Sequence, residues 1–259
     1  MQNSIEFKNT KIHFTTEGKG SVIVLLHGFL ENFTMWNSIG RELSKKHRVV
    51  SIDLLGHGKT GCIGYIHSME EMADAVKAVL KELRIRRAIF IGHSMGGYVS
   101  LAFVEKYPKN VKGICLMNST AQADSEERKQ LRIRANEMAK ENFETLIKMS
   151  IGNLFAENMR VQLFNEIEKV RNEALKIQVR GYIAASEGMR LRKNREAVLQ
   201  TIDKRLMIVG KQDPILNYKI VENEAKRTNT SLIKLPNGHM SHIEAKDELL
   251  KALIEFVKP

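Results

Sequence analysis

The chain has 259 residues, of which 43% are hydrophobic and 27% are charged, and its formal net charge at pH 7 is +11. This composition excludes a largely disordered chain, because disordered chains hold too few apolar residues to offset the entropy lost on folding. A chain of this length buries enough surface to need no disulfide or metal staple, and it suits one large α/β domain or two small ones.

Cysteine usage and the N-terminal segment predict a reduced, cytoplasmic protein. Of the 2 cysteines, Cys115 lies in an apolar run and Cys62 lies in a loop flanked by glycines, so neither indicates a disulfide framework. The first residues lack the basic and apolar regions of a signal peptide. Apolar runs such as residues 22–26 are too short to span a bilayer, so we expect no membrane insertion.

The positive charge does not by itself predict a nucleic-acid partner. Residues 122–204 hold 16 Lys and Arg against 13 Asp and Glu, so only a small part of the net charge of +11 lies there. Basic clusters at residues 84–87 and 190–193 are short, and no long basic tract or aromatic-rich strand accompanies them. We interpret the charge as a solvated surface with a basic bias and expect no nucleic acid to bind.

The first 120 residues alternate between short β-branched runs and helical patterns. Residues 5–7 and 11–15 predict a hairpin, and residues 69–83 carry apolar side chains at three- and four-residue spacing, which predicts an amphipathic helix. Near-continuous apolar runs predict parallel strands that are covered on both faces, at 21–26, 48–52, 88–91 and 111–117. The alternation predicts the α/β class, with a mostly parallel central sheet and helices on both faces.

The pattern changes near Ala121. Residues 122–204 are charged, rich in methionine and helical in periodicity, which predicts an inserted helical lid. Strand patterns return at 205–209 and 231–235, and a last amphipathic helix is predicted at 245–257. We therefore divide the chain into a first core part at 1–121, a helical cap at 122–204 and a second core part at 205–259.

The strongest local signal is the motif Gly92-His93-Ser94-Met95-Gly96, which follows an apolar strand pattern and precedes a helical one. This is the G-x-S-x-G nucleophile elbow in its strand–turn–helix setting. The sharp turn strains the backbone of the serine, and a Cβ atom on either glycine would crowd it. We therefore predict Ser94 as a nucleophile at a helix N-terminus, where developing negative charge is favoured; a purely structural glycine turn is the alternative.

A second strand pattern ends in His27-Gly28-Phe29 and continues into a loop. The backbone N–H groups of Phe29 and Met95 can point at one oxygen, so we predict that they form an oxyanion hole. His27 is interpreted as a structural residue that holds the loop, with a role as catalytic base as the weaker hypothesis. The glycine-rich loop at residues 53–60 lacks the spacing of a phosphate-binding loop.

A serine nucleophile needs a base, and the base needs an acid that orients it. Asp213 follows the strand pattern at 205–209, and His239 follows the one at 231–235. Both positions lie at the carboxyl ends of predicted parallel strands, where open sheets place their sites. We therefore predict a catalytic triad of Ser94, Asp213 and His239, in the chain order expected for a nucleophile elbow.

Other titratable residues offer alternatives for the base, the acid and a metal site. His242 is an alternative base, and Asp124 is an alternative acid. His242 and His239 stand at H-x-x-H spacing, but no Glu lies between them and no third ligand is apparent, so we expect no metal. We expect His93 to point away from the nucleophile. Surface positions are expected for the histidines in polar surroundings, His13, His47 and His67.

Five ordered landmarks together resemble the α/β-hydrolase superfamily across nearly the whole chain. They are HGF at 27–29, DLLGHGKT at 53–60, GHSMGG at 92–97, GKQDP at 210–214 and NGHMSHIE at 237–244. The helical insert is similar to the cap domain of that superfamily, and residues 188–192 are similar to the cap exit of small-ester and enol-lactone hydrolases.

Three positions refine the resemblance. Leu55 stands where proline is frequent and Thr60 where serine is frequent, and neither touches the expected chemistry. Ser94 stands where haloalkane dehalogenases and epoxide hydrolases carry Asp, which disfavours both reactions.

The resemblance implies a serine hydrolase that needs no cofactor and acts on a small-molecule ester or acyl substrate through an acyl-enzyme on Ser94. Four methionines of the insert can line an adaptable acyl pocket, although packing within the insert is the favoured interpretation for any single one of them: Met138, Met149, Met159 and Met189. Trp36 is expected to support packing, with contact to the substrate as the weaker hypothesis. The alternatives are the same fold and triad used for carbon–carbon bond hydrolysis, perhydrolysis or a lyase step of the menaquinone-pathway type, and a non-catalytic ligand-binding protein.

Overall fold

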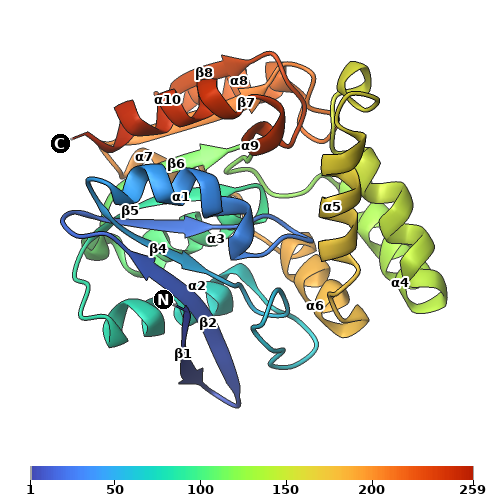
Figure 1. The fold of residues 1–259 in the computed structure, drawn as a ribbon, viewed down its shortest axis with the longest axis horizontal. Coiled ribbons are helices and arrows are strands. Elements are labelled where there is room, and N and C mark those ends of the chain that lie inside the picture. The colour runs from blue at the N-terminus through green and yellow to red at the C-terminus, as the bar shows by residue number, and fades with distance from the viewer. Residues whose placement is uncertain (1, 259) are drawn as a thin grey trace.

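The computed structural model describes residues 2–258, which are built around one sheet of eight strands (Figure 1). The strand order is β1-β2-β4-β3-β5-β6-β7-β8; β2 pairs antiparallel with β1 and β4, and the pairs from β4 to β8 are parallel. The strands are β1 (Gln2–Phe7), β2 (Thr10–Glu17), β3 (Val22–Leu26), β4 (Arg48–Ile52), β5 (Ala88–His93), β6 (Val111–Met117), β7 (Arg205–Gly210) and β8 (Ser231–Leu235). The predicted, mostly parallel sheet is confirmed.

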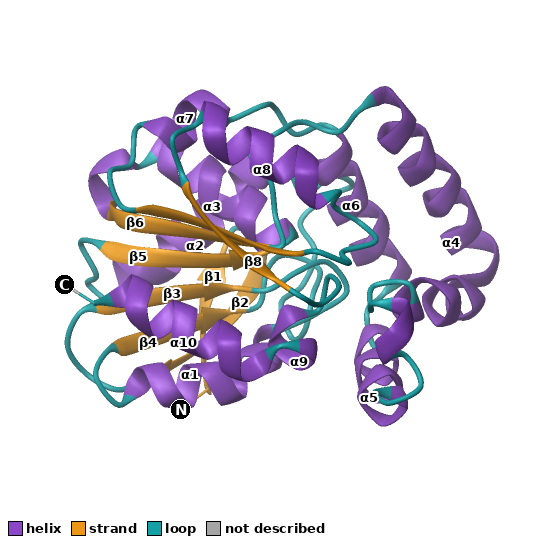
Figure 2. Cartoon of the chain, turned by 90° about the horizontal axis from the view of Figure 1, so that it is seen from above, coloured by secondary structure: helices purple, strands orange, loops and turns teal. Residues whose placement is uncertain are grey.

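Both faces of the sheet are buried. In β3, Val24 and Leu26 join the apolar cluster on one face, whereas Ile23 and Leu25 join the cluster on the other, as the two-residue period of a strand requires. Helices cover both faces (Figure 2). The first face is covered by α2 (Met69–Glu82), α3 (Met95–Lys106) and α8 (Tyr218–Arg227), and the second by α1 (Asn37–Ser44) and α10 (Lys246–Val257). The predicted α/β class is therefore confirmed.

Helix α2 shows how local sequence sets an element that supports the sheet. The Ser68 hydroxyl accepts a hydrogen bond from the N–H of Glu71 and caps the helix, and acidic residues occupy the first turn. The apolar stripe predicted for this segment, including Met72 and Val76, is buried except for Leu83, which is partly buried. The cap and the apolar stripe are both local sequence signals for the same helix, so α2 could be predicted from the sequence.

Between β6 and β7 the described residues contain helices and no strand. The helices are α4 (Glu126–Gly152), the short η3 (Glu157–Met159), α5 (Phe164–Ala174), α6 (Val179–Arg190) and α7 (Glu196–Gln200). Asn142 breaks the helical backbone of α4, and its side chain accepts from the N–H of Thr145, so a new helical segment starts there. In Figure 2, α4, α5 and α6 lie beyond the carboxyl ends of the strands.

These inserted helices have a hydrophobic core of their own. Ile147, Ile167 and Tyr182 pack together, and Leu30 and Met240 from the core loops join the same cluster. The helices therefore dock on the loops that follow β3 and β8. None of the helices in the described range 2–258 combines the length and the hydropathy of a membrane-spanning segment.

Candidate active site

Ser94 lies at the turn between β5 and α3. Its φ of 46° and ψ of −111° are a conformation that a residue with a side chain adopts only under strain. The N–H of Ser94 donates to the carbonyl of Met117 at 2.9 Å, and the Ser119 hydroxyl donates to the carbonyl of Ser94 at 2.7 Å. Its flanking residues His93 and Met95 are buried, whereas Ser94 is partly exposed. The fold therefore presents this serine in a strained turn.

The two glycines of the motif are needed because other backbone lies against them. A Cβ atom on Gly96 would lie 2.2 Å from the carbonyl oxygen of Leu26, and one on Gly92 would lie 2.4 Å from backbone atoms of Gly96. Neither contact can be relieved by turning a side chain, because the opposing atoms belong to the main chain. The close approach brings the start of α3 against the end of β3.

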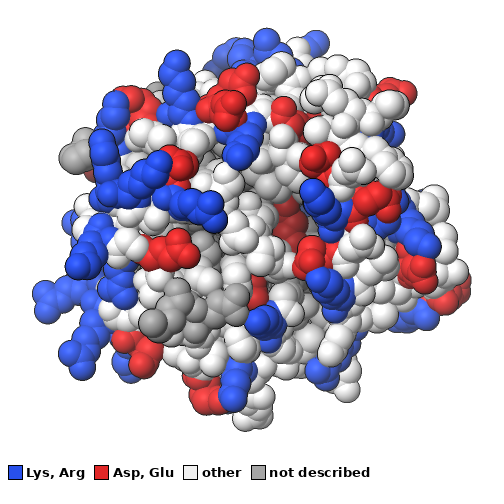
Figure 3. Space-filling view, in the orientation of Figure 1, with Lys and Arg blue, Asp and Glu red and all other residues white. Residues whose placement is uncertain are grey.

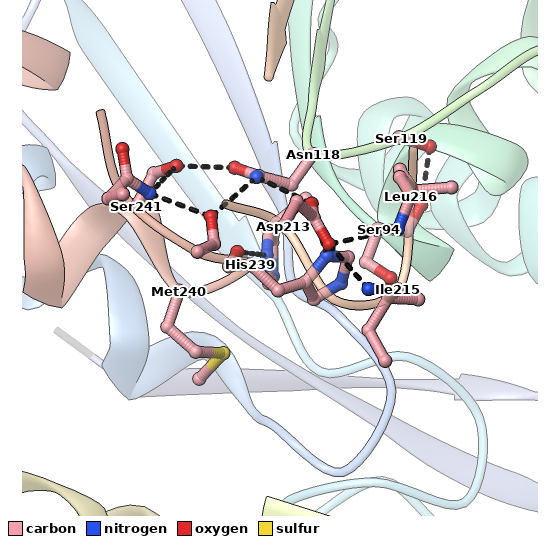
Figure 4. A network of polar contacts seen from close by, with 12 residues as sticks. Ser94, Asn118, Ser119, Asp213, Ile215, Leu216, His239, Met240 and Ser241 are labelled. Carbon is pink, nitrogen blue, oxygen red and sulfur yellow. Dashed lines mark hydrogen bonds and ion pairs between the residues drawn. The ribbon is translucent and has the colours of Figure 1, made fainter. Parts of the chain in front are cut away.

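Asp213 and His239 come from the loops after β7 and β8. Oδ2 of Asp213 lies 2.8 Å from Nδ1 of His239 and accepts a hydrogen bond from Nδ2 of Asn118 at 3.0 Å. Oδ1 of Asp213 accepts from the N–H groups of Ile215 and Leu216 at 2.8 and 2.9 Å. Both oxygens of this buried carboxylate are therefore engaged (Figure 4).

These contacts lower the pKa of Asp213. Burial alone raises the pKa of this carboxyl, but the electrostatic interaction and hydrogen bond with His239, together with the hydrogen bonds from Asn118 and Leu216, outweigh burial and hold it below its ordinary value. Asp213 is thus ionised near neutral pH and holds the imidazole by one nitrogen.

A second layer of polar side chains supports this pair (Figure 4). Oδ1 of Asn118 accepts from the hydroxyl of Ser241 at 2.5 Å, and that hydroxyl accepts from Nδ2 of Asn237 at 2.8 Å. The sequence predictions missed Asn118, although it follows directly after the predicted strand 111–117. Its place after that strand is the signal that could have found it, because polar residues at strand ends meet at one edge of the sheet.

The loop after β3 carries the predicted oxyanion donor Phe29. His27 holds this loop: its Nε2 accepts from the N–H of Leu54 at 2.9 Å, and its Nδ1 lies 2.7 Å from the carbonyl oxygen of Gly28. Within residues 2–258, neither the N–H of Phe29 nor that of Met95 donates to another protein group. The geometry of His27 agrees with the structural role expected for it.

Ser94 and His239 line the same cavity, which has a volume of about 170 Å³. Segments from the sheet side and from the inserted helices enclose it: Phe29, Tyr98, Arg128, Arg132, Leu154, Tyr182, Met189, Ile215 and Met240. The rings of Phe29 and Tyr182 pack with their centroids 4.8 Å apart, so α6 touches the loop that carries the expected oxyanion donor.

A larger hollow of about 730 Å³ lies between α1 and α5, and acidic side chains lie within it (Figure 3). It shares Leu30 and Glu31 with the smaller cavity, but neither Ser94 nor His239 is among its lining residues. Because a substrate must reach both Ser94 and His239 to react, the smaller cavity is the candidate active site.

A family model described as the alpha/beta hydrolase fold matches residues 21–246. The chain belongs to this family. Solved structures agree with this assignment: an esterase from Thermogutta terrifontis, determined with malate bound, superposes with a TM-score of 0.92 at 29% identity over 99% of this chain and 98% of its own. An enol-lactonase from Burkholderia xenovorans superposes with a TM-score of 0.91 at 22% identity, over 98% of this chain and 99% of its own.

Sequence matches to curated relatives span different shares of this α/β hydrolase. An uncharacterized protein of Mycobacterium tuberculosis is 33% identical over 106 residues, which is 41% of this chain and 31% of that protein, so the match spans about a third of the relative's length. A pimeloyl-[acyl-carrier protein] methyl ester esterase of Aliivibrio salmonicida is 23% identical over 96% of this chain and 97% of its own.

The alternative acid and base of this α/β hydrolase are engaged elsewhere. The carboxylate of Asp124 is buried and binds Arg132 and Arg192, at 2.6 and 2.7 Å, rather than a histidine of the described chain. Nε2 of His242 lies 3.5 Å from Oε1 of Glu31, and burial lowers the pKa of His242 to about 4. His242 is therefore a neutral imidazole away from Asp213.

Next to His242 lies a cluster of side chains that the sequence spacing did not predict. Ligand atoms of Glu31, His93 and His242 all lie within 4.8 Å of one another, and His239, the partner of His242 in the H-x-x-H spacing, is not part of this cluster. These groups already bind one another: Nδ1 of His93 lies 2.6 Å from Oε2 of Glu31, and Nε2 of His93 lies 3.1 Å from the carbonyl oxygen of His239. Sequence spacing could not show this, because Glu31 is 62 residues from His93.

The Glu31–His93 pair links the two loops of the site. Burial raises the pKa of Glu31, but the charge and hydrogen bond of His93 outweigh burial and lower it to about 2. Burial lowers the pKa of His93, but Glu31 outweighs burial and raises it. Oε2 of Glu31 also accepts from the N–H of Gly28 at 2.8 Å. The ion pair therefore connects the loop after β3, which carries Phe29, to the loop after β8, which carries His239, because His93 contacts both Glu31 and the carbonyl oxygen of His239.

Two sequence expectations are wrong. His67 is fully buried rather than exposed, because its N–H donates to the carbonyl of Ala184 where the chain passes beneath α6. Of the four methionines only Met189 lines the cavity. Met138 and Met149 are 43% and 61% exposed, because they lie on the outer side of α4, and Met159 is half-buried outside the cavity lining. Trp36 is buried, as expected of a packing residue.

Proposed function

We propose that this α/β hydrolase cleaves a carboxylic ester, or a related acyl bond, of a small molecule through an acyl-enzyme on Ser94. One observation carries the proposal. A serine in a strained strand–helix turn shares a cavity with a histidine whose Nδ1 is held by a buried, ionised carboxylate. That set of groups is what nucleophilic acyl transfer needs.

The roles of the groups follow from their contacts. Because Nδ1 of His239 is bound by Asp213, Nε2 takes the proton of the Ser94 hydroxyl as its oxygen attacks the substrate carbonyl. The negative charge on the carbonyl oxygen is stabilised by the N–H groups of Phe29 and Met95. His239 then returns the proton to the leaving alcohol, and a water molecule, deprotonated by the same nitrogen, releases the acid and restores Ser94.

The inserted helices are proposed to act as a cap, for which 122–204 is the predicted extent. They supply Tyr182 and Met189 to the cavity that holds Ser94. The cavity of about 170 Å³ is smaller than the 300–1,000 Å³ typical of sites for drug-sized ligands, which favours a short acyl group.

A series of 4-nitrophenyl esters from acetate to decanoate tests this proposal. We expect kcat/KM to be highest for the short esters and to fall with acyl length, because the cavity is small. Ser94→Ala should lower kcat by about 10⁵–10⁶-fold, whereas Ser231→Ala, at an exposed serine in β8, should change it little.

Covalent labelling separates the outcomes. A fluorophosphonate probe should label the wild type and not Ser94→Ala. A wild type that is neither labelled nor active on any ester would refute the proposal and leave a ligand-binding protein. Acid and alcohol released in equal amounts would distinguish ester hydrolysis from perhydrolysis or a lyase reaction.

A further inference from the structure

Arg128 lies where the candidate active site adjoins a surface groove. It lies in the first turn of α4 and lines both the cavity of about 170 Å³ that holds Ser94 and an adjoining groove of about 340 Å³. Tyr98 and Ile215 also line both spaces. A substrate that extends from Ser94 into the groove therefore passes Arg128.

The positive charges around Arg128 exceed the negative ones. Arg132 and Arg192 lie near it, and both bind the single buried carboxylate of Asp124. Arg192 is further held by the carbonyls of Gln122 and Met189, and its guanidinium lies 3.9 Å from the ring centre of Tyr98. Asp124 thus brings a single negative charge to three guanidinium groups, of which Arg132 and Arg192 bind it, and all three stay charged because arginine remains protonated in proteins.

In the part of the chain that the structure describes, the guanidinium of Arg128 has no hydrogen-bond acceptor. Within residues 2–258, no hydrogen bond or ion pair joins its side chain to another group. The side chain is partly buried, and burial together with the charge of Arg132 lowers its pKa. Nearby acids do not compensate: Glu126 and Glu127 are exposed, and Glu126 pairs with Lys129.

A partly desolvated guanidinium without a partner favours the binding of an anion that approaches through the groove. Carboxylates match its planar pair of donors and form charge-assisted, bidentate hydrogen bonds. An arginine on the outer surface would need no such partner, because water solvates it; Arg134, on the same helix, is exposed in this way.

We propose that the substrate carries a free carboxylate distant from the scissile bond and that Arg128 binds it, with Arg132 and Arg192 adding positive charge. This inference rests on the proposed acyl transfer at Ser94 and defines its substrate class as half-esters, or ester and lactone derivatives of carboxylic acids that keep one acid free. Arg128 is then the residue that determines specificity.

Paired substrates test the inference. Monomethyl succinate, glutarate and adipate are compared with neutral methyl esters of equal chain length, and 4-acetoxybenzoate with its methyl ester, so that the charge lies on either side of the scissile bond. The wild type should prefer the charged member of at least one pair. Arg128→Gln should lower this preference by about 10- to 100-fold, mainly through KM, as expected for loss of a charge-assisted hydrogen bond.

Two further variants control for charge and folding. Arg128→Lys, which keeps the charge without the fork, should retain part of the preference. Arg134→Gln removes the same charge from the exposed part of the same helix and should leave the preference unchanged. Equal turnover of charged and neutral esters by the wild type, or a preference that Arg128→Gln does not lower, would overturn the inference while leaving the proposed function intact.

Direct binding separates the two proposals. Calorimetric titration of the wild type with glutarate should show binding that Arg128→Gln abolishes, whether or not any ester is cleaved. Glutarate binding that depends on Arg128 in a protein without esterase activity would support the anion site and refute the proposed hydrolysis. Tighter binding of inorganic phosphate than of glutarate would overturn the assignment to a carboxylate.

Discussion

Replacing Asp213 by Asn tests how the carboxylate controls the imidazole of His239. Oδ1 of Asp213 accepts from two backbone N–H groups, and Oδ2 lies within hydrogen-bond distance of Asn118 Nδ2 and His239 Nδ1. An amide has only one acceptor oxygen. If that oxygen takes the Oδ1 position, the new NH₂ group faces the amide of Asn118 and the imidazole.

Only one tautomer of His239 then satisfies the NH₂ group. Nδ1 must accept, so the proton moves to Nε2, and the imidazole no longer takes the proton of Ser94. We expect kcat/KM to fall about 10⁴-fold, which corresponds to about 5 kcal/mol of transition-state stabilisation. The donor facing Asn118 stays unsatisfied, which should lower the free energy of unfolding by about 1–3 kcal/mol.

The assay measures kcat/KM on 4-nitrophenyl acetate from pH 5 to 9, together with urea unfolding of both proteins. Asp203→Asn, the same change at an exposed acid, serves as the control and should match the wild type in both measurements. An Asp213→Asn enzyme within tenfold of the wild type across this range would refute the reasoning, because the tautomer would then not depend on Asp213.

Two further predictions concern stability. Gly96→Ala places a Cβ atom 2.2 Å from the carbonyl oxygen of Leu26 and should lower the free energy of unfolding, measured in urea, by at least about 2 kcal/mol. The same variant should lose labelling by the fluorophosphonate probe. Gly152→Ala is its control; it meets no atom within 4 Å at the end of α4 and should be neutral or stabilise by up to about 1 kcal/mol. Glu31→Gln should destabilise the protein at pH 7 by about 3–5 kcal/mol, because His93 loses its buried partner.

The pH dependence of this last variant has a defined sign. The pKa of Glu31 is lowered to about 2, so its ionised form stabilises the folded state above about pH 4, and this stabilisation is lost as the pH falls through about 2. Urea unfolding between pH 5 and 2 should therefore show a smaller loss of stability in Glu31→Gln than in the wild type. Parallel losses in the two proteins would contradict a buried ion pair.

The strand-and-helix order and the serine turn were accessible from the sequence because they depend on neighbouring residues. The apolar run before Ser94, the glycines on either side of it and the helical spacing after it all act within a dozen residues. The approach of Asp213 to His239 was also accessible, because parallel strands of one sheet end at the same edge and both residues follow strand patterns.

Other features depend on contacts between distant segments. Glu31 meets His93 across 62 residues, and Asn118 meets Asp213 across 95. Nothing in the local pattern around His67 shows that α6 covers it, and helical periodicity in α4 does not show which side faces the cavity, so the expectations for Met138 and Met149 were wrong. Residue type and spacing do not predict which distant residues come into contact.

The amino-acid sequence by itself determined the α/β class, the strained serine turn and the strand ends that carry acid and base, because hydrophobic period and glycine sterics act along the chain. The tertiary structure alone decided which inserted residues enclose the cavity and that Glu31 and His93 form a buried ion pair. It also decided that Arg128 lines the cavity of Ser94 without a hydrogen-bond acceptor among the described residues. Charge compensation and burial are sums over all neighbours in space, and those neighbours exist only once the chain has folded.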